Sequence, residues 1–156
     1  MSSPALDRLK ALALAVPRPG CEWEDRPRFA PPASEEAIAS LGREAGFSLP
    51  QDFAAFLREH SAVVAMSIHN GYWLGGLSAS SRETSMRSVF GRPAIVAATD
   101  GGGNPFLLTA DGRIWRCDRE TRAMREVASS FTAFLDRVAD DWEAYATDAP
   151  EWQYLV

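Results

Sequence analysis

The residues best suited to binding a ligand form the loop Asp100-Gly101-Gly102-Gly103-Asn104. Three consecutive glycines carry too much backbone freedom for regular structure, and backbone amides in such a loop can cradle a phosphate. A dinucleotide-binding loop opens a helix, whereas this loop leads into Pro105 and an apolar run typical of a strand. We therefore expect a flexible strand connection, with a functional loop at a protein interface as the second interpretation.

Other reactive side chains are few and do not cluster in the sequence. His60 lies at an expected helix end and His69 in an expected turn, without the spacing of a metal site. Gly76–Ser80 has the first half of a nucleophile elbow but lacks its closing glycine. Cys21 and Cys117 are far apart and are expected to be free thiols in a reducing cytoplasm. The residues predict no catalytic group, no metal and no cofactor.

Negative charge is concentrated at the C-terminal end of the chain. The formal net charge is −5, and the segment from Ser129 onward, with six acids and Arg137, accounts for all of it. Asp140, Asp141 and Glu143 suit a solvated helix face better than acid–base catalysis, because neighbours on a helix point in different directions. Such a field repels nucleic acid and attracts basic partners. The simpler interpretation of this charge is a solvated helix face that keeps the protein soluble.

Four aromatic side chains lie outside any strong apolar stripe: Tyr72, Trp73, Trp152 and Tyr154. Tyrosine and tryptophan are enriched at interface hot spots, although a loop tryptophan more often folds back onto the core. We take Tyr72, Trp73 and Trp152 as candidate partner contacts.

Helical spacing and end signals predict four helices. The first covers Pro4–Val16, the second begins after the N-cap Ser34 and ends at Gly46, and the third runs from Pro50 to about His60. The last begins at Ser129 or Ser130. Its core-facing stripe has helical spacing and comprises Phe131, Phe134, Leu135, Val138 and Trp142.

Short apolar and β-branched runs predict the strands, which are Ala62–Ile68, Tyr72–Leu74, Ala94–Thr99, Phe106–Ala110, Arg113–Cys117 and Met124–Val127. Asp111-Gly112 indicates a two-residue hairpin turn, which would place Leu108 opposite Trp115 and Phe106 opposite Cys117. Gly75–Phe90 gives no clear signal. We predict one α+β domain over 1–156: an antiparallel sheet of four to six strands, with helices packed before and after it.

The order of these pieces resembles the SUKH superfamily (the Smi–Knr group) over about residues 23 to 138. In that family an early helix leads to a Leu-Pro that opens a second helix. A strand, a Gly/Asp-rich loop, a "D-G-x-hydrophobic" hairpin and a terminal "S-F-x-x-F-L" helix follow. The matching segments are Ser34–Ile38, Leu49–Phe53 with Phe56-Leu57, Asp100–Asn104, Asp111–Trp115 and Ala128–Leu135. The helix at 4–16 and an acidic, aromatic extension at 139–156 lie outside this region.

Because the sequence shows no catalytic constellation, we expect a binding domain and not an enzyme, and we expect it in the bacterial cytoplasm. Bacterial members are similar to immunity proteins of polymorphic toxin systems, which bind a cognate toxin, often a nuclease, and block it. We expect a basic toxin partner, neither nucleic acid nor membrane, and contacts from Tyr72, Trp73, Asp100, Asn104, Asp140, Asp141, Glu143 and Trp152. A regulatory or scaffold module, and a small-ligand binder or enzyme that uses the Asp100–Asn104 loop, are the alternatives.

Overall fold

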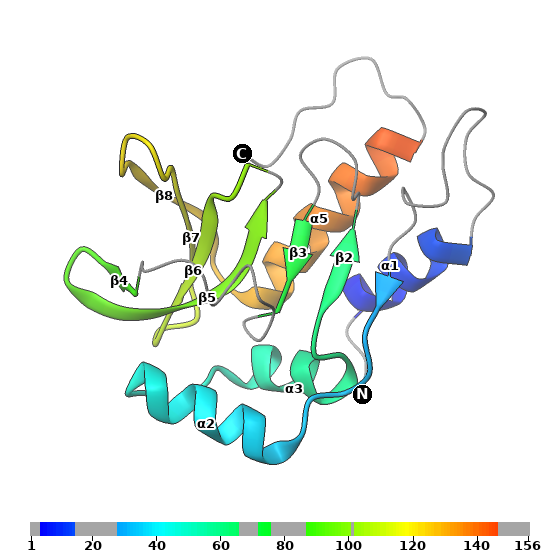
Figure 1. The fold of residues 1–156 in the computed structure, drawn as a ribbon. Helices are drawn as coiled ribbons and strands as arrows, with labels where there is room; N and C mark the ends of the chain where they lie inside the picture. The colour runs from blue at the N-terminus through cyan, green and yellow to red at the C-terminus, as the bar shows by residue number, and fades with distance from the viewer. Residues whose placement is uncertain (1–3, 15–27, 66–71, 76–86, 101, 147–156) are drawn as a thin grey trace.

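The computed structural model describes residues 4–14, 28–65, 72–75, 87–100 and 102–146. Within them it contains four helices and an antiparallel sheet, which confirms the α+β class. The helices are α1 (Pro4–Leu14), α2 (Glu35–Ala45), α3 (Gln51–Glu59) and α5 (Phe131–Ala146). None of them is long and apolar enough to cross a membrane. Figure 1 shows α5 lying across the sheet with α1 beside it, while α2 and α3 close one end.

The predicted helix signals act as expected in the described part of the chain. The Ser34 Oγ accepts a hydrogen bond from the Ala37 amide at 3.1 Å, which satisfies a donor at the start of α2. Gly46 ends that helix in the left-handed conformation, with φ +79°. The Ser130 Oγ accepts from the Ala133 amide at 3.0 Å and caps α5.

The main core lies between α5 and the sheet, and it is built largely from aromatic rings. The predicted stripe of α5 is buried throughout. Phe131 packs edge-on against Phe53 and Phe56 of α3, with ring centroids 4.9 and 5.0 Å apart. Phe134 contacts Phe106 of the sheet at 4.9 Å. One helix face therefore joins α3 to the sheet, as its spacing predicted.

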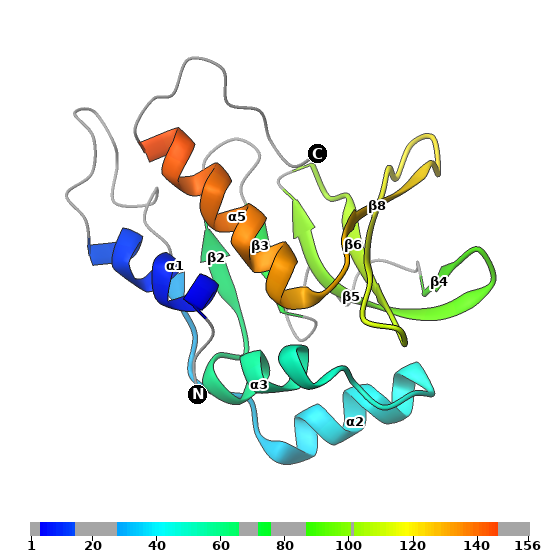
Figure 2. The same cartoon turned by 180° about the vertical axis from the view of Figure 1, so that it is seen from behind.

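The sheet follows the order β1-β2-β3-β5-β6-β7-β8, with β4 pairing only β5. All the pairs are antiparallel. The strands are β1 (Arg28–Phe29), β2 (Val63–Ala65), β3 (Tyr72–Leu74), β4 (Ser88–Val89), β5 (Arg92–Asp100), β6 (Pro105–Thr109), β7 (Ile114–Cys117) and β8 (Met124–Ala128). Figure 2 shows from behind how α5 crosses the sheet between α1 and β8.

The predicted register of the β6–β7 hairpin is wrong by one residue. Leu108 pairs with Ile114, not Trp115, and Phe106 pairs with Arg116, not Cys117. The cause is a three-residue loop. The Thr109 amide donates to the Arg113 carbonyl at 3.1 Å, and Gly112 has φ +89°. A type I turn followed by a left-handed glycine gives this loop length.

This register gives the hairpin two apolar faces. Phe106, Leu108 and Ile114 join the main core under α5. Leu107 and Cys117 belong to a second, smaller cluster, together with Val89, Ala94 and Val96, and Trp115 and Met124 pack against it. A bulge between Val96 and Ala98 shifts the register along β5. The hairpin thus has apolar residues on both faces.

Several predicted features lie outside the described residues. They are the C-terminal part of the first helix beyond Leu14, the remainder of the Ala62–Ile68 strand, the turn at 69–71 and Gly76–Ser80. Cys21, Trp152 and Tyr154 lie there too.

Candidate partner-binding surfaces

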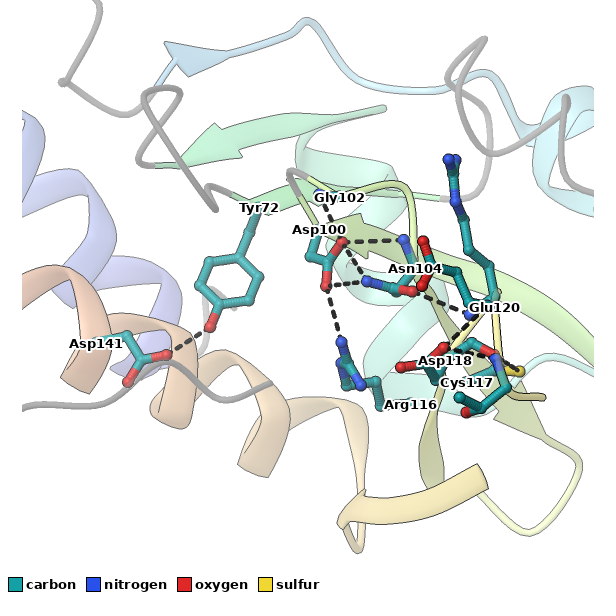
Figure 3. A network of polar contacts seen from close by, with 11 residues as sticks. Tyr72, Asp100, Gly102, Asn104, Arg116, Cys117, Asp118, Glu120 and Asp141 are labelled. Carbon is teal, nitrogen blue, oxygen red and sulfur yellow. Dashed lines mark hydrogen bonds and ion pairs between the residues drawn. The ribbon is translucent and has the colours of Figure 1, made fainter. Parts of the chain in front are cut away.

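The Asp100 loop is closed by its own carboxylate (Figure 3). The Asp100 side chain is only 3% exposed. Its Oδ1 accepts hydrogen bonds from the Gly102 and Asn104 amides, each at 2.9 Å. The Asn104 Nδ2 donates to both carboxylate oxygens, at 3.2 and 3.1 Å. The Gly102 and Asn104 amides already donate to this carboxylate and the Gly103 amide donates to the Asp100 carbonyl, so the geometry does not favour the ligand-cradle interpretation.

A second set of contacts ties this loop to the β7–β8 turn. The Asn104 Oδ1 accepts from the Arg119 amide at 3.0 Å. The Arg116 guanidinium lies 3.6 Å from the Asp100 carboxylate. Gly103 has φ +81°, and a Cβ atom there would lie 2.7 Å from the Arg119 Nη1. The Asp100 loop, which connects β5 to β6, therefore packs against the turn that connects β7 to β8.

In the β7–β8 turn and its neighbours, two side chains have shifted pKa values. Hydrogen bonds from the Thr121 and Glu120 amides lower the pKa of Asp118. Burial raises the pKa of the Cys117 thiol, which is free and buried. The Asp118 carboxylate orders the turn by accepting these two hydrogen bonds, and the Cys117 thiol lies in the interior and presents no reactive atom at the surface. No group of three or more potential metal ligands occurs among the residues that the structure describes.

The two neighbouring aromatic candidates lie on β3, and they are placed differently. Tyr72 is fully buried, and its hydroxyl donates to the Asp141 Oδ2 at 2.5 Å. Trp73 is half-buried and pairs with Thr99 across the strands. Figure 3 shows the Tyr72 hydroxyl pointing toward Asp141 and away from Asp100. Tyr72 therefore positions α5 against the sheet, and its side chain is not at the surface.

The remaining acids of α5 form the acidic surface, which we define as Asp136, Asp140 and Glu143. The Asp140 and Glu143 side chains are 68% and 59% exposed. Arg8 of α1 reaches all three carboxylates, at 2.9 Å from Asp140, 2.8 Å from Glu143 and 4.0 Å from Asp136. The hydrogen bond to Asp140 raises the pKa of Arg8. Three carboxylates around one guanidinium leave this surface net negative.

The sequence reasoning missed this role of Arg8. Of the predicted contact residues, the structure brings Asp140 and Glu143 together, and it joins Asp100 to Asn104 at another place. Trp152 lies outside the described residues. Leu6 and Leu9 of α1 are buried in the main core, but nothing in the local sequence indicates that α1 packs against α5. That contact depends on the tertiary arrangement.

A second exposed feature was also missed, and we call it the aromatic turn: Phe90 and Gly91 between β4 and β5, with Arg92 and Trp115 beside them. Phe90 is 72% exposed. The sequence signal was the dipeptide Phe90-Gly91, because glycine is common in two-residue hairpin turns. Phenylalanine is not, so the turn was not recognised.

Two hollows in the surface lie beside α3. One, of about 160 Å³, includes Asp52, Phe56 and Thr132 in its lining. The other is an open groove of about 580 Å³ between α2 and α3. In the first, the Asp52 Oδ2 already accepts from the Thr132 amide at 2.9 Å. Its polar group therefore serves to join α3 to α5.

Comparison with known proteins agrees with this architecture. Residues 32–137, which hold α2 to the first turns of α5, match the SMI1/KNR4 family (SUKH-1). No curated protein matches the chain. The matched region covers well over half of the sequence, and it contains the capped helix, the Asp100 loop and the hairpin that carried the resemblance. The chain belongs to the SMI1/KNR4 family (SUKH-1).

Proposed function

We propose that this chain is an immunity-type protein that binds a cognate bacterial toxin domain and blocks it by occlusion, in the cytoplasm and without catalysis of its own. The SUKH family includes immunity-type proteins. The observation that carries the proposal for this chain is the acidic surface. Its carboxylates are exposed, and they are held in a fixed arrangement by a residue from another helix.

A negative surface suits a basic target for two reasons. Opposite fields speed the encounter of two proteins, most strongly at low salt. A carboxylate can also occupy the place of a substrate phosphate, as in a nuclease site. Arg8 neutralises part of this surface, so its removal should strengthen the field.

The direct test uses the product of the gene next to this one, which the proposal expects to be the co-encoded toxin. The purified protein should inhibit it with a one-to-one endpoint, and the complex should survive gel filtration. A toxin domain that keeps its full activity in the presence of excess protein would contradict the proposal.

The Arg8→Gln variant tests whether the acidic surface takes part. It removes the Arg8 contacts to Asp140 and Glu143 and one positive charge from the acidic surface, so association with the toxin should become several-fold faster at low salt and approach the wild-type rate at high salt. Arg43→Gln is the matched control, because Arg43 is an exposed α2 arginine paired with Glu36 at 2.8 Å. Equal rates for wild type and both variants would exclude the acidic surface as the docking face.

A further inference from the structure

Phe90 is the one large hydrophobic side chain that is exposed in the described part of the chain. It begins a two-residue turn in which Val89 pairs with Arg92. The β4–β5 hairpin projects from the body of the protein on the side away from α1, as both ribbon views show (Figures 1 and 2). The turn that carries Phe90 therefore lies at an extremity of the molecule, and the side chain is 72% exposed to a partner.

The backbone of this turn is unfavourable for phenylalanine. Phe90 has φ +49° and Gly91 has φ +79°. Turns with two positive φ values prefer Asn-Gly or Gly-Gly, and a bulky residue at positive φ is a genuine outlier. Phe90 thus carries two disadvantages for stability, its backbone conformation and its exposed apolar surface. Strained backbone of this kind is found at ligand clamps and functional sites.

The ring is nevertheless held in place by its neighbours. It packs edge-on against Trp115, with centroids 5.7 Å apart and planes at 88°. The Arg92 guanidinium lies 5.6 Å from the centroid of the same Trp115 ring, and its Nη1 lies 3.3 Å from the Asp111 carboxylate. A side chain that is fixed before binding loses less conformational entropy when it binds.

The charged side chains beside the aromatic turn form ion pairs in which positive and negative charges are equal in number. Arg92 and Arg113 share Asp111, at 3.3 and 3.4 Å. Arg113 also pairs with Glu126 at 2.8 Å. Two cations and two carboxylates cancel, unlike the acidic surface. The contact chemistry offered here is therefore apolar.

The exposed area argues for a hot spot within a larger heterologous interface. One phenyl ring supplies far less than the ~800 Å² per partner of a stable dimer, so a second copy of this chain is not the occupant that the turn favours. A few aromatic anchors that enter pockets carry most of the binding energy in interfaces between different proteins.

We infer that Phe90 is the apolar anchor of the toxin complex and that its ring enters an uncharged, apolar pocket on the toxin domain. This inference rests on the proposed function and adds an apolar contact that is separate from the acidic surface, whose charges attract the toxin over a longer range. It assigns the two surfaces different work: the acids speed association, and Phe90 slows dissociation.

The test measures association and dissociation rates of the co-encoded toxin domain with wild type, Phe90→Ala and Phe90→Asn, at low and high salt. Both substitutions should raise the dissociation rate at least tenfold at both salt concentrations and leave the association rate within about twofold. Phe90→Asn creates the preferred Asn-Gly turn, so its melting temperature should equal or exceed that of wild type. Ser88→Ala, an exposed change in the same hairpin, is the control and should alter neither rate.

The outcomes separate the two proposals. A wild-type protein that does not bind the toxin overturns both the proposed function and this inference. Tight binding by wild type with unchanged dissociation of the two Phe90 variants overturns the inference alone. Because Phe90→Asn relieves the turn, weak binding by a fully folded Phe90→Asn protein cannot be attributed to unfolding.

Discussion

The acidic surface and the aromatic turn hold their exposed side chains by different means. The acidic surface depends on tertiary structure, because Arg8 of α1 must pack beside α5 before it can reach Asp140 and Glu143. The aromatic turn is mostly local, with Phe90 and Arg92 in one hairpin and Trp115 on a nearby strand. One surface is net negative and sensitive to salt, whereas the other is apolar and charge-balanced. A substitution that disturbs the packing of α1 can therefore alter the acidic surface and leave the aromatic turn unchanged.

The largest expected effect is a loss of stability when the packing of α1, the helix that carries Arg8, is weakened. Leu9 is fully buried in the main core, so Leu9→Ala should lower the free energy of unfolding by about 2–5 kcal/mol. Ala11→Ser, an exposed change on the same helix, should stay within about 0.5 kcal/mol of wild type. Urea unfolding measures both. A Leu9→Ala protein as stable as the control would mean that α1 does not anchor the acidic surface.

The next effect concerns the aromatic turn alone. Gly91 has φ +79°, and a Cβ atom there would meet nothing within 4 Å. Gly91→Ala should therefore cost about 1–2 kcal/mol through the backbone conformation only. Gly42→Ala is the comparison variant. Gly42 lies within a helix, where alanine is favoured over glycine, so this substitution should not lower the free energy of unfolding. If Gly91→Ala unfolds at the same denaturant concentration as wild type, the left-handed turn is not the conformation in solution.

A smaller effect is expected at the Arg8 ion pairs. They are largely exposed, so Arg8→Gln should change the free energy of unfolding by less than about 1 kcal/mol. High salt should reduce even this difference, because it screens exposed charges. Thermal melts of wild type and variant at two ionic strengths measure the change. A loss of several kcal/mol would contradict this expectation and show that Arg8 is needed for folding. The association rate of Arg8→Gln would then not report on surface charge alone.

The smallest effect is a pH dependence of the stability that comes from Asp111, the ion-pair partner of Arg92. The hydrogen bond from the Thr109 hydroxyl, at 2.6 Å, is the main cause that lowers the pKa of Asp111 below its ordinary value of 3.8. A lowered folded-state pKa stabilises the protein above the ordinary pKa, and this contribution is lost as the pH falls through the folded-state value. Wild type should therefore exceed Asp111→Asn in stability at pH 6, and the gap should narrow below about pH 4. A gap that widens on acidification would contradict this assignment.

Local signals explain why most of the fold could be predicted. The Ser34 cap and the Gly46 terminus depend on contacts within a few residues, and the stripe of α5 is visible in the helical spacing of its apolar residues. Each is found where the sequence placed it. The hairpin register was missed because Asp111-Gly112 is compatible with two loop lengths that differ by one residue. In the structure the Thr109–Arg113 hydrogen bond closes the three-residue loop.

The candidate surfaces were harder to predict because they depend on distant or unusual residues. Arg8 and Glu143 are 135 residues apart in sequence, and no periodic pattern connects them. Tyr72 looked like a contact residue, yet its hydroxyl meets Asp141 inside the protein. Phe90 was missed because phenylalanine contradicts the preference of its turn. Features that oppose local preference are those that sequence rules cannot predict.

The most direct test of the central claim is a titration of the co-encoded toxin domain with this protein while the toxin activity is followed. Binding by occlusion predicts a linear loss of activity that ends at one equivalent and returns when the complex dissociates. Full toxin activity at several equivalents, or irreversible loss of activity caused by a substoichiometric amount of the protein, would contradict it.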